Sequence, residues 1–169
     1  MENKECDFNF FKPGQGSGDC GMTDLLGGRR VPKTHCLIKL NALLDDLNAC
    51  LGLMKTEKCS NGTFPFCDET EEIQKMILKI SAKTAGMNAD LSPLAGILEE
   101  KTLSLNKKHC PPKEFILPGA NRAESLCHCA RTKTRLCEIA AWEAGEKETA
   151  KILNRMSDYF FIMCIALRK

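Results

Sequence analysis

Residues 40–54 read LNALLDDLNACLGLM, and the apolar side chains of this stretch recur with the period of an α-helix. Six of them fall at i, i+3, i+4, i+7, i+11 and i+14: Leu40, Leu43, Leu44, Leu47, Leu51 and Met54. This spacing places them on one face of a helix, whereas Asp45, Asp46 and Asn48 lie off that face. We therefore expect a helix over about 36–56 that buries its leucines against other helices.

Further segments carry helix signals and are separated by proline and glycine. We expect these helices to begin near Asp68 and to cover 93–107, 121–143 and 145–167. Residues 107–119, KKHCPPKEFILPG, should form a loop because adjacent prolines cannot continue a helix. The sequence thus predicts an all-α bundle of four or five helices in one domain, with the bundle at 36–169 and an irregular glycine-rich segment at 1–35.

Length, charge and hydropathy restrict the function classes. A chain of 169 residues is most simply one domain. Its net charge of +2 creates no strong field toward nucleic acid or a membrane, so we expect neither as a partner. The longest apolar run, 160–167, is too short to cross a bilayer, and MENKECDFNF is not a signal peptide. We therefore expect a cytoplasmic protein.

The eleven cysteines form no C-x-x-C pair. Cys127 and Cys129 flank His128, but residues i and i+2 of a helix point apart, so this cluster is a poor metal site. We expect most cysteines to be small buried hydrophobes in a reducing cytoplasm. A cysteine-rich redox or metal-binding helical bundle remains the alternative.

Several polar patches could bind a ligand. Residues 17–33, SGDCGMTDLLGGRRVPK, offer flexible backbone N–H groups and cations that could wrap phosphates; a solvated linker is the alternative. Arg131, Arg135 and Glu138 share one helix face, where two guanidinium groups could meet one anion; a salt-bridged solvent face is the alternative.

Two smaller features have similar alternatives. Asn154 and Asp158 lie one turn apart on the last helix, where they could equally be an exposed polar face. Phe115 and Ile116 precede Pro118-Gly119 and could plug the end of the bundle.

Motifs along nearly the whole chain, from about Gly18 to Arg168, resemble those of the PduO-type ATP:cob(I)alamin adenosyltransferases. Residues 17–33 resemble the family pattern T-G-D-x-G-x-T-x-L-x-G-G-x-R-V-x-K, and residues 44–53 (LDDLNACLGL) resemble V-D-E-L-N-x-x-L-G-L. Residues 115–120 (FILPGA) resemble F-I-L-P-G-G, and residues 125–138 (SLCHCARTKTRLCE) resemble A-L-H-x-A-R-x-x-x-R-R-A-E. Residues 153–161 (LNRMSDYFF) resemble L-N-R-L-S-D-Y-L-F.

The resemblance implies a fold and a reaction. The family folds as a five-helix bundle of ferritin-like type and assembles as a homotrimer, with ATP and corrinoid bound at subunit interfaces. It transfers the 5′-deoxyadenosyl group of ATP to the cobalt of cobalamin or another corrinoid and releases triphosphate, using Mg²⁺. Co(I) is the nucleophile, so no side-chain nucleophile is required and the protein's task is to position the two substrates. The implied partners are a reductase that supplies Co(I) and an adenosylcobalamin-dependent enzyme that receives the product.

The resemblance also implies site residues. Phe115 packs under the corrin ring and keeps the lower axial ligand off cobalt. Arg135 contacts the triphosphate, and Arg131 pairs with Asp45 of a neighbouring subunit. The remaining implied residues are Glu138 and Asn154 for the nucleotide, Glu138 also for Mg²⁺, Asn48 for the corrinoid, and Gly18, Asp19, Gly21, Thr23, Arg29 and Lys33 for a loop that closes over the phosphates.

Some positions depart from the family pattern. Leu136 replaces a second arginine, Gly16 and Cys20 stand where cations are common, and Ala120 replaces a glycine. Losing two charge-assisted contacts would weaken ATP binding by roughly two to four powers of ten unless another cation, such as Arg30 or Lys12, compensates. A non-catalytic corrinoid-binding or delivery paralogue is therefore the alternative.

Overall fold

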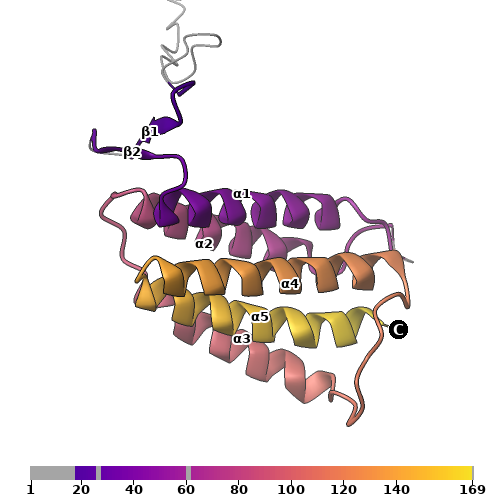
Figure 1. The fold of residues 1–169 in the computed structure, drawn as a ribbon. Helices are drawn as coiled ribbons and strands as arrows, with labels where there is room; N and C mark the ends of the chain where they lie inside the picture. The colour runs from indigo at the N-terminus through magenta and orange to yellow at the C-terminus, as the bar shows by residue number, and fades with distance from the viewer. Residues whose placement is uncertain (1–17, 26–27, 60–61, 169) are drawn as a thin grey trace, which may run out of the picture.

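The computed structural model describes residues 18–25, 28–59 and 62–168. A short hairpin precedes five helices (Figure 1). The elements are β1 Met22–Asp24, β2 Arg30–Pro32, α1 Cys36–Lys55, α2 Cys67–Thr84, α3 Leu94–Lys108, α4 Arg122–Glu143 and α5 Lys147–Leu167. The predicted all-α, five-helix bundle is confirmed, and each predicted helix is present.

The ends of the helices follow local signals in the sequence. His35 caps α1, because its Nδ1 accepts a hydrogen bond from the N–H of Leu37 at 3.2 Å. Asn121 caps α4, because its Oδ1 accepts from the N–H of Glu124 at 2.9 Å. Between α4 and α5 the chain reverses through Gly145, whose φ of 77° suits glycine.

The N-terminal segment is not wholly irregular. β1 and β2 pair antiparallel, with Thr23 opposite Val31, and Val31 is buried. Each strand has only three residues, which is too short for an alternating pattern to stand out from the sequence. The prediction of irregular structure was therefore wrong for this part of residues 1–35.

The core lies between the helices. α4 and α5 pack along each other, α1 packs on α4, α2 on α1, and α3 on α5, as Figure 1 shows. The predicted apolar face of α1 is buried at Leu40, Leu44, Leu47, Leu51 and Met54. Truncation of one such leucine to alanine would cost about 2–5 kcal/mol.

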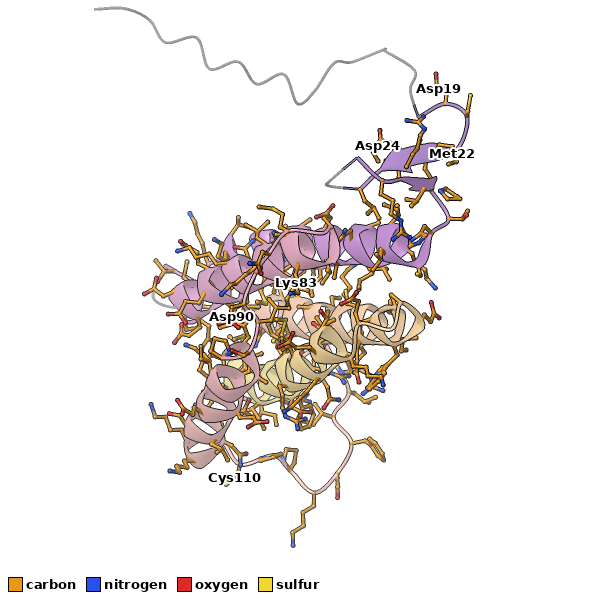
Figure 2. The ribbon with its side chains drawn as sticks, turned by 90° about the vertical axis from the view of Figure 1, so that its left-hand side faces the viewer. Asp19, Met22, Asp24, Lys83, Asp90 and Cys110 are labelled. Carbon is orange, nitrogen blue, oxygen red and sulfur yellow. The ribbon has the colours of Figure 1, made fainter. Side chains whose placement is uncertain are left out.

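Two segments outside the core carry most of the expected site residues. The hairpin stands off the N-terminal end of α1, with Asp19 at its outer part (Figure 2). The connection between α3 and α4 runs outside the bundle toward the N-terminal end of α4 (Figure 1). Within the described ranges, none of the helices is long and apolar enough to span a bilayer.

Candidate functional site

A cavity of about 350 Å³ opens beside the connection between α3 and α4. Its lining residues are Lys113, Glu114, Phe115 and Ile116 from the connection, His128 and Arg131 from α4, and Phe161 from α5. Phe115 is fully exposed, so the interpretation that it plugs the end of the bundle is wrong. An exposed aromatic ring at the mouth of a cavity is typical of a surface that something else covers.

Two side chains that line this cavity carry buried nitrogen atoms. Nε of Arg131 and both ring nitrogens of His128 are buried, and none has a hydrogen-bond partner among the described residues. His128 Nε2 lies 3.3 Å from Oε1 of Glu124, without hydrogen-bond geometry. Burial lowers the pKa of His128, against the opposing charge of Glu124 and with the help of Arg131. A ligand in the cavity could satisfy these groups.

Glu124 is a residue that the sequence reasoning missed. It is fully buried at the start of α4, and its Oε2 accepts hydrogen bonds from the N–H groups of Gly119 at 2.9 Å and Ala120 at 3.2 Å. Oε1 accepts from Nη1 of Arg168 at 3.0 Å. The signal was the pair Asn121-x-x-Glu124, which matches a helix cap with an acidic residue three positions later.

The face of α4 that carries Arg131 and Arg135 is not salt-bridged within the described residues. Arg135 is exposed, and neither Arg131 nor Arg135 forms an ion pair in the part of the chain that the structure describes. The alternative of a salt-bridged face is therefore wrong for these two residues. They remain available to an anion.

α4 and α5 bring together Glu138 and Asn154, the two residues that the family resemblance assigns to the nucleotide. Nδ2 of Asn154 donates to Oε1 of Glu138 at 3.3 Å, and Asn154 Oδ1 accepts from Nη1 of Arg155 at 2.7 Å. Asp158, one turn further on, is exposed. The described residues contain no group of three or more His, Cys, Asp or Glu that could hold a metal ion. A single carboxylate suits Mg²⁺ that is also held by phosphate oxygens.

α1 presents Asp45 and Asn48. Asp45 is exposed and has no ion-pair partner within 18–25, 28–59 and 62–168, whereas the adjacent Asp46 pairs with Lys133 of α4. Asn48 is half-buried, and its side-chain oxygen is buried without a partner among those same residues. One chain therefore does not join Asp45 to Arg131.

The glycine-rich loop is held by its own backbone. The N–H of Gly21 donates to the carbonyl of Gly18 at 3.1 Å, and the N–H of Lys33 donates to the carbonyl of Gly21 at 2.8 Å. Gly21 has a φ of 73°, which suits glycine. A side chain at Gly18 would come within 3.0 Å of Lys33 Nζ. This loop thus places a lysine ammonium next to a bare stretch of backbone.

The other loop residues lie on the hairpin itself. Thr23 is on β1, and Asp24 pairs with Arg30 at 3.2 Å. Nη2 of Arg29 lies 3.3 Å from Nε2 of His35. Asp19 is exposed on the side of the hairpin away from the helices (Figure 2). The hairpin and the helix face of Arg135 therefore do not enclose one site within a single chain.

The departures from the family pattern have different structural settings. Ala120 has no positive φ, so its backbone does not require glycine, and its N–H bonds Glu124. Cys20 is exposed in a turn. Leu136 is 53% exposed and lies on α4 with Ile139 at 54% and Trp142 at 55%. Gly16 and Lys12 lie outside the described residues.

The cysteines only partly follow the expectation that most are buried. All ten described cysteines are free thiols, of which four are buried: Cys50, Cys127, Cys137 and Cys164. Cys127 is buried and Cys129 exposed, so their side chains point apart as predicted. Burial raises the pKa of Cys137 to about 12, which keeps that thiol protonated and unreactive.

Comparisons with known proteins agree with one another. A family model described as cobalamin adenosyltransferase matches residues 15–167. The chain is 29% identical over 167 residues to a cobalamin adenosyltransferase of Cupriavidus metallidurans, covering 90% of this chain and 86% of that one. It is 30% identical over 162 residues to a corrinoid adenosyltransferase of Bacillus subtilis, covering 86% and 80%.

The fold matches solved structures as well. A variant PduO-type ATP:corrinoid adenosyltransferase from Lactobacillus reuteri, complexed with cobalamin and ATP, superposes with a TM-score of 0.84. The two are 26% identical, and the match covers 93% of this chain and 91% of that chain.

Proposed function

The chain belongs to the cobalamin adenosyltransferase family, and on that premise we propose that it transfers the 5′-deoxyadenosyl group of ATP to the Co(I) centre of a corrinoid. The electron pair of Co(I) attacks C5′ of ATP, a Co–C bond forms, and the C5′–O bond breaks as triphosphate leaves. The observation that carries the proposal is a cavity lined by the exposed Phe115 and by His128 and Arg131, whose buried nitrogens have no hydrogen-bond partner among the described residues.

Phe115 acts on the underside of the macrocycle. Its fully exposed ring is available to pack against a flat apolar ligand, and this contact displaces the lower axial donor from cobalt. Without that donor the added electron enters an orbital of lower energy, so reduction to Co(I) becomes easier. Phe161 and Ile116 supply further apolar wall.

Arg135, Glu138 and Asn154 act on the nucleotide. Arg135 is exposed and unpaired in the described chain, so it can contact the triphosphate and stabilise the charge that develops on the leaving group. Asn154 holds the Glu138 carboxylate by a hydrogen bond of 3.3 Å. Mg²⁺ held by Glu138 and the phosphates would supply further positive charge there.

The glycine-rich loop closes over the phosphates. Gly18 and Gly21 let backbone N–H groups approach an anion, and Lys33 Nζ lies beside Gly18. Arg29, Thr23 and Asp19 belong to the same loop. The hairpin stands apart from α4 and α5 of its own chain (Figure 1). The nucleotide that this loop covers therefore lies against α4 and α5 of a neighbouring protomer.

The active assembly is a homotrimer with its sites at subunit interfaces. Asp45 has no ion-pair partner in the described part of its own chain, so it can pair with Arg131 of a neighbouring protomer. Asn48, on the same helix, contacts the corrinoid. Leu136, Ile139 and Trp142 are all more than half exposed on α4 and form an apolar stripe that assembly would bury. In this account Leu136 is an interface residue, so its replacement of an arginine need not abolish catalysis.

The reaction requires two further proteins. A reductase supplies Co(I), and an adenosylcobalamin-dependent enzyme receives the product. The ten free thiols of the described chain fit a reducing compartment, so the enzyme acts in the cytoplasm.

A direct test is to mix the purified protein with ATP, Mg²⁺ and chemically reduced cobalamin and follow the visible spectrum. We expect conversion to the adenosylated form at a rate that depends on ATP. Corrinoid binding without turnover would instead select the non-catalytic paralogue that Leu136 and Cys20 suggest. Absence of both ATP binding and conversion would overturn the proposal.

A further inference from the structure

The connection that carries Phe115 cannot be held in place by burial of its own apolar side chains. Phe115 is fully exposed and Leu117 is 81% exposed. Only Ile116 among the three apolar residues of FIL is half-buried. An exposed segment with few apolar contacts opens locally at low cost. Something else must therefore keep Phe115 at the mouth of the cavity.

Polar contacts from the C-terminal end of α5 hold this connection. Nη1 of Arg168 donates to the carbonyl of Leu117 at 2.9 Å and to Oε1 of Glu124 at 3.0 Å. Nδ2 of Asn121 donates to the carbonyl of Leu167 at 2.6 Å. The backbone before Pro118 and the side chain of Asn121 after it are thus both tied to the end of the last helix.

Glu124 completes the tie from the other side. Its Oε2 accepts from the N–H groups of Gly119 and Ala120 at 2.9 and 3.2 Å. The Glu124 side chain is completely buried, whereas that of Arg168 is 39% exposed. A buried carboxylate is costly unless it is paired and fully hydrogen-bonded, so Arg168 stabilises the charge that Glu124 uses to hold the turn.

The chemistry favours arginine at this position. One guanidinium nitrogen carries two N–H groups, which here serve a carbonyl of the connection and a carboxylate of α4. A lysine ammonium is a more mobile point charge and holds two acceptors less firmly.

We infer that Arg168 and Glu124 are positioning residues that fix the loop carrying Phe115, and so determine how completely the lower axial ligand is kept off cobalt. This inference rests on the role proposed for Phe115. The tie acts through the loop backbone, so it should affect the corrinoid and not the nucleotide.

The test compares Arg168→Ala with Arg122→Ala in the full-length protein. Arg122 is a matched control because it lies at the same end of α4 but its side chain pairs with Glu57, in the segment after α1, at 2.9 Å. In Arg168→Ala, the amide protons of Gly119 and Ala120 should exchange at least about tenfold faster, the effect of losing one charged hydrogen bond. In Arg122→Ala their exchange should match the wild type.

The second readout is the spectrum of cob(II)alamin with saturating ATP. We expect Arg168→Ala to lower the fraction of four-coordinate Co(II) and kcat by about tenfold or more, with the KM for ATP within about twofold of wild type. Arg168→Lys keeps the cation beside Glu124, so its fraction of four-coordinate Co(II) and its kcat should lie between those of the wild type and those of Arg168→Ala. Phe115→Ala gives the spectrum of a protein without the ring.

Each outcome decides a separate point. Unchanged exchange at Gly119 and Ala120 in Arg168→Ala would overturn the tie. Faster exchange with a wild-type Co(II) spectrum would overturn the link to Phe115. If the wild type itself formed no four-coordinate Co(II), the role proposed for Phe115 would be wrong, and the exchange rates would still decide whether Arg168 holds the loop.

Discussion

Arg135 is the residue whose substitution should affect the proposed catalysis most and the stability of the fold least. Its side chain is exposed and forms no ion pair in the described chain, so its removal should cost the fold little. We expect Arg135→Ala to lower kcat/KM for ATP by about ten- to a hundredfold, the worth of a charge-assisted contact. The melting temperature should move by no more than about 2 °C. Arg122→Ala is the control, and equal losses of activity in the two variants would contradict the role of Arg135.

His128 should make the fold sensitive to mild acid. Burial lowers its pKa from the ordinary 6.5, so the folded protein holds it neutral while the unfolded chain binds a proton. Its contribution to the free energy of unfolding is therefore complete above about pH 6.5 and decreases as the pH falls toward the lowered pKa.

The matching experiment follows thermal melting of wild type and His128→Gln between about pH 7.5 and about pH 5.5. The wild type should lose more melting temperature over this range than His128→Gln. The control is His109→Gln, which removes a half-buried histidine at the C-terminal end of α3. Parallel curves for wild type and His128→Gln would mean that the buried ring does not resist protonation.

Single residues also show which contacts can be predicted from the sequence and which cannot. The shared face of Arg131, Arg135 and Glu138 follows from helical spacing, and the structure places all three on α4. Glu124 could be predicted as part of a helix cap, but its partner Arg168 lies 44 positions away. Spacing along one helix cannot indicate a contact that depends on how the end of another helix packs.

α4 has one face buried in the bundle and another that exposes apolar side chains. One face is buried against α1 and α5, and the apolar stripe of Leu136, Ile139 and Trp142 is left uncovered in the single chain. We expect Ile139→Glu to convert the assembly to monomers, because a charge in the centre of a buried interface would lack a partner. Sedimentation measures this directly.

Leu78→Glu is the matched control for that change. Leu78 is 57% exposed on α2, close to the 54% of Ile139, but it is not part of the stripe on α4. The control should assemble as the wild type does. If Ile139→Glu also remained assembled, α4 would not form the interface.

Whole elements could be predicted unequally well. Each long helix has a clear apolar period and a proline, glycine or cap near its ends, so the predicted bounds agree with the structure to within about two residues. For α2 the sequence predicts only the start. The three-residue strands β1 and β2 gave no period. The exposure of Phe115 could not be predicted either, because a loop hydrophobe looks the same in sequence whether it packs inward or awaits a ligand.

The whole molecule leaves its proposed site unfinished in one chain. Asp45 and Arg131 form no ion pair with each other, and the hairpin stands away from the helices that carry Glu138 and Asn154 (Figure 1). A sequence describes one chain, so the residues could be predicted from the family patterns but their meeting across protomers could not be derived from spacing. The central claim is that neighbouring protomers complete each site.

Co-expression of Asp45→Ala chains with Arg131→Ala chains tests that claim most directly. Each variant alone should be nearly inactive in adenosylation of reduced cobalamin. Mixed trimers purified through two different tags should recover about a third of wild-type turnover, because a head-to-tail ring that contains both variants pairs an intact Asp45 with an intact Arg131 at one of its three interfaces. Mixed trimers no more active than either variant alone would contradict a site shared between protomers.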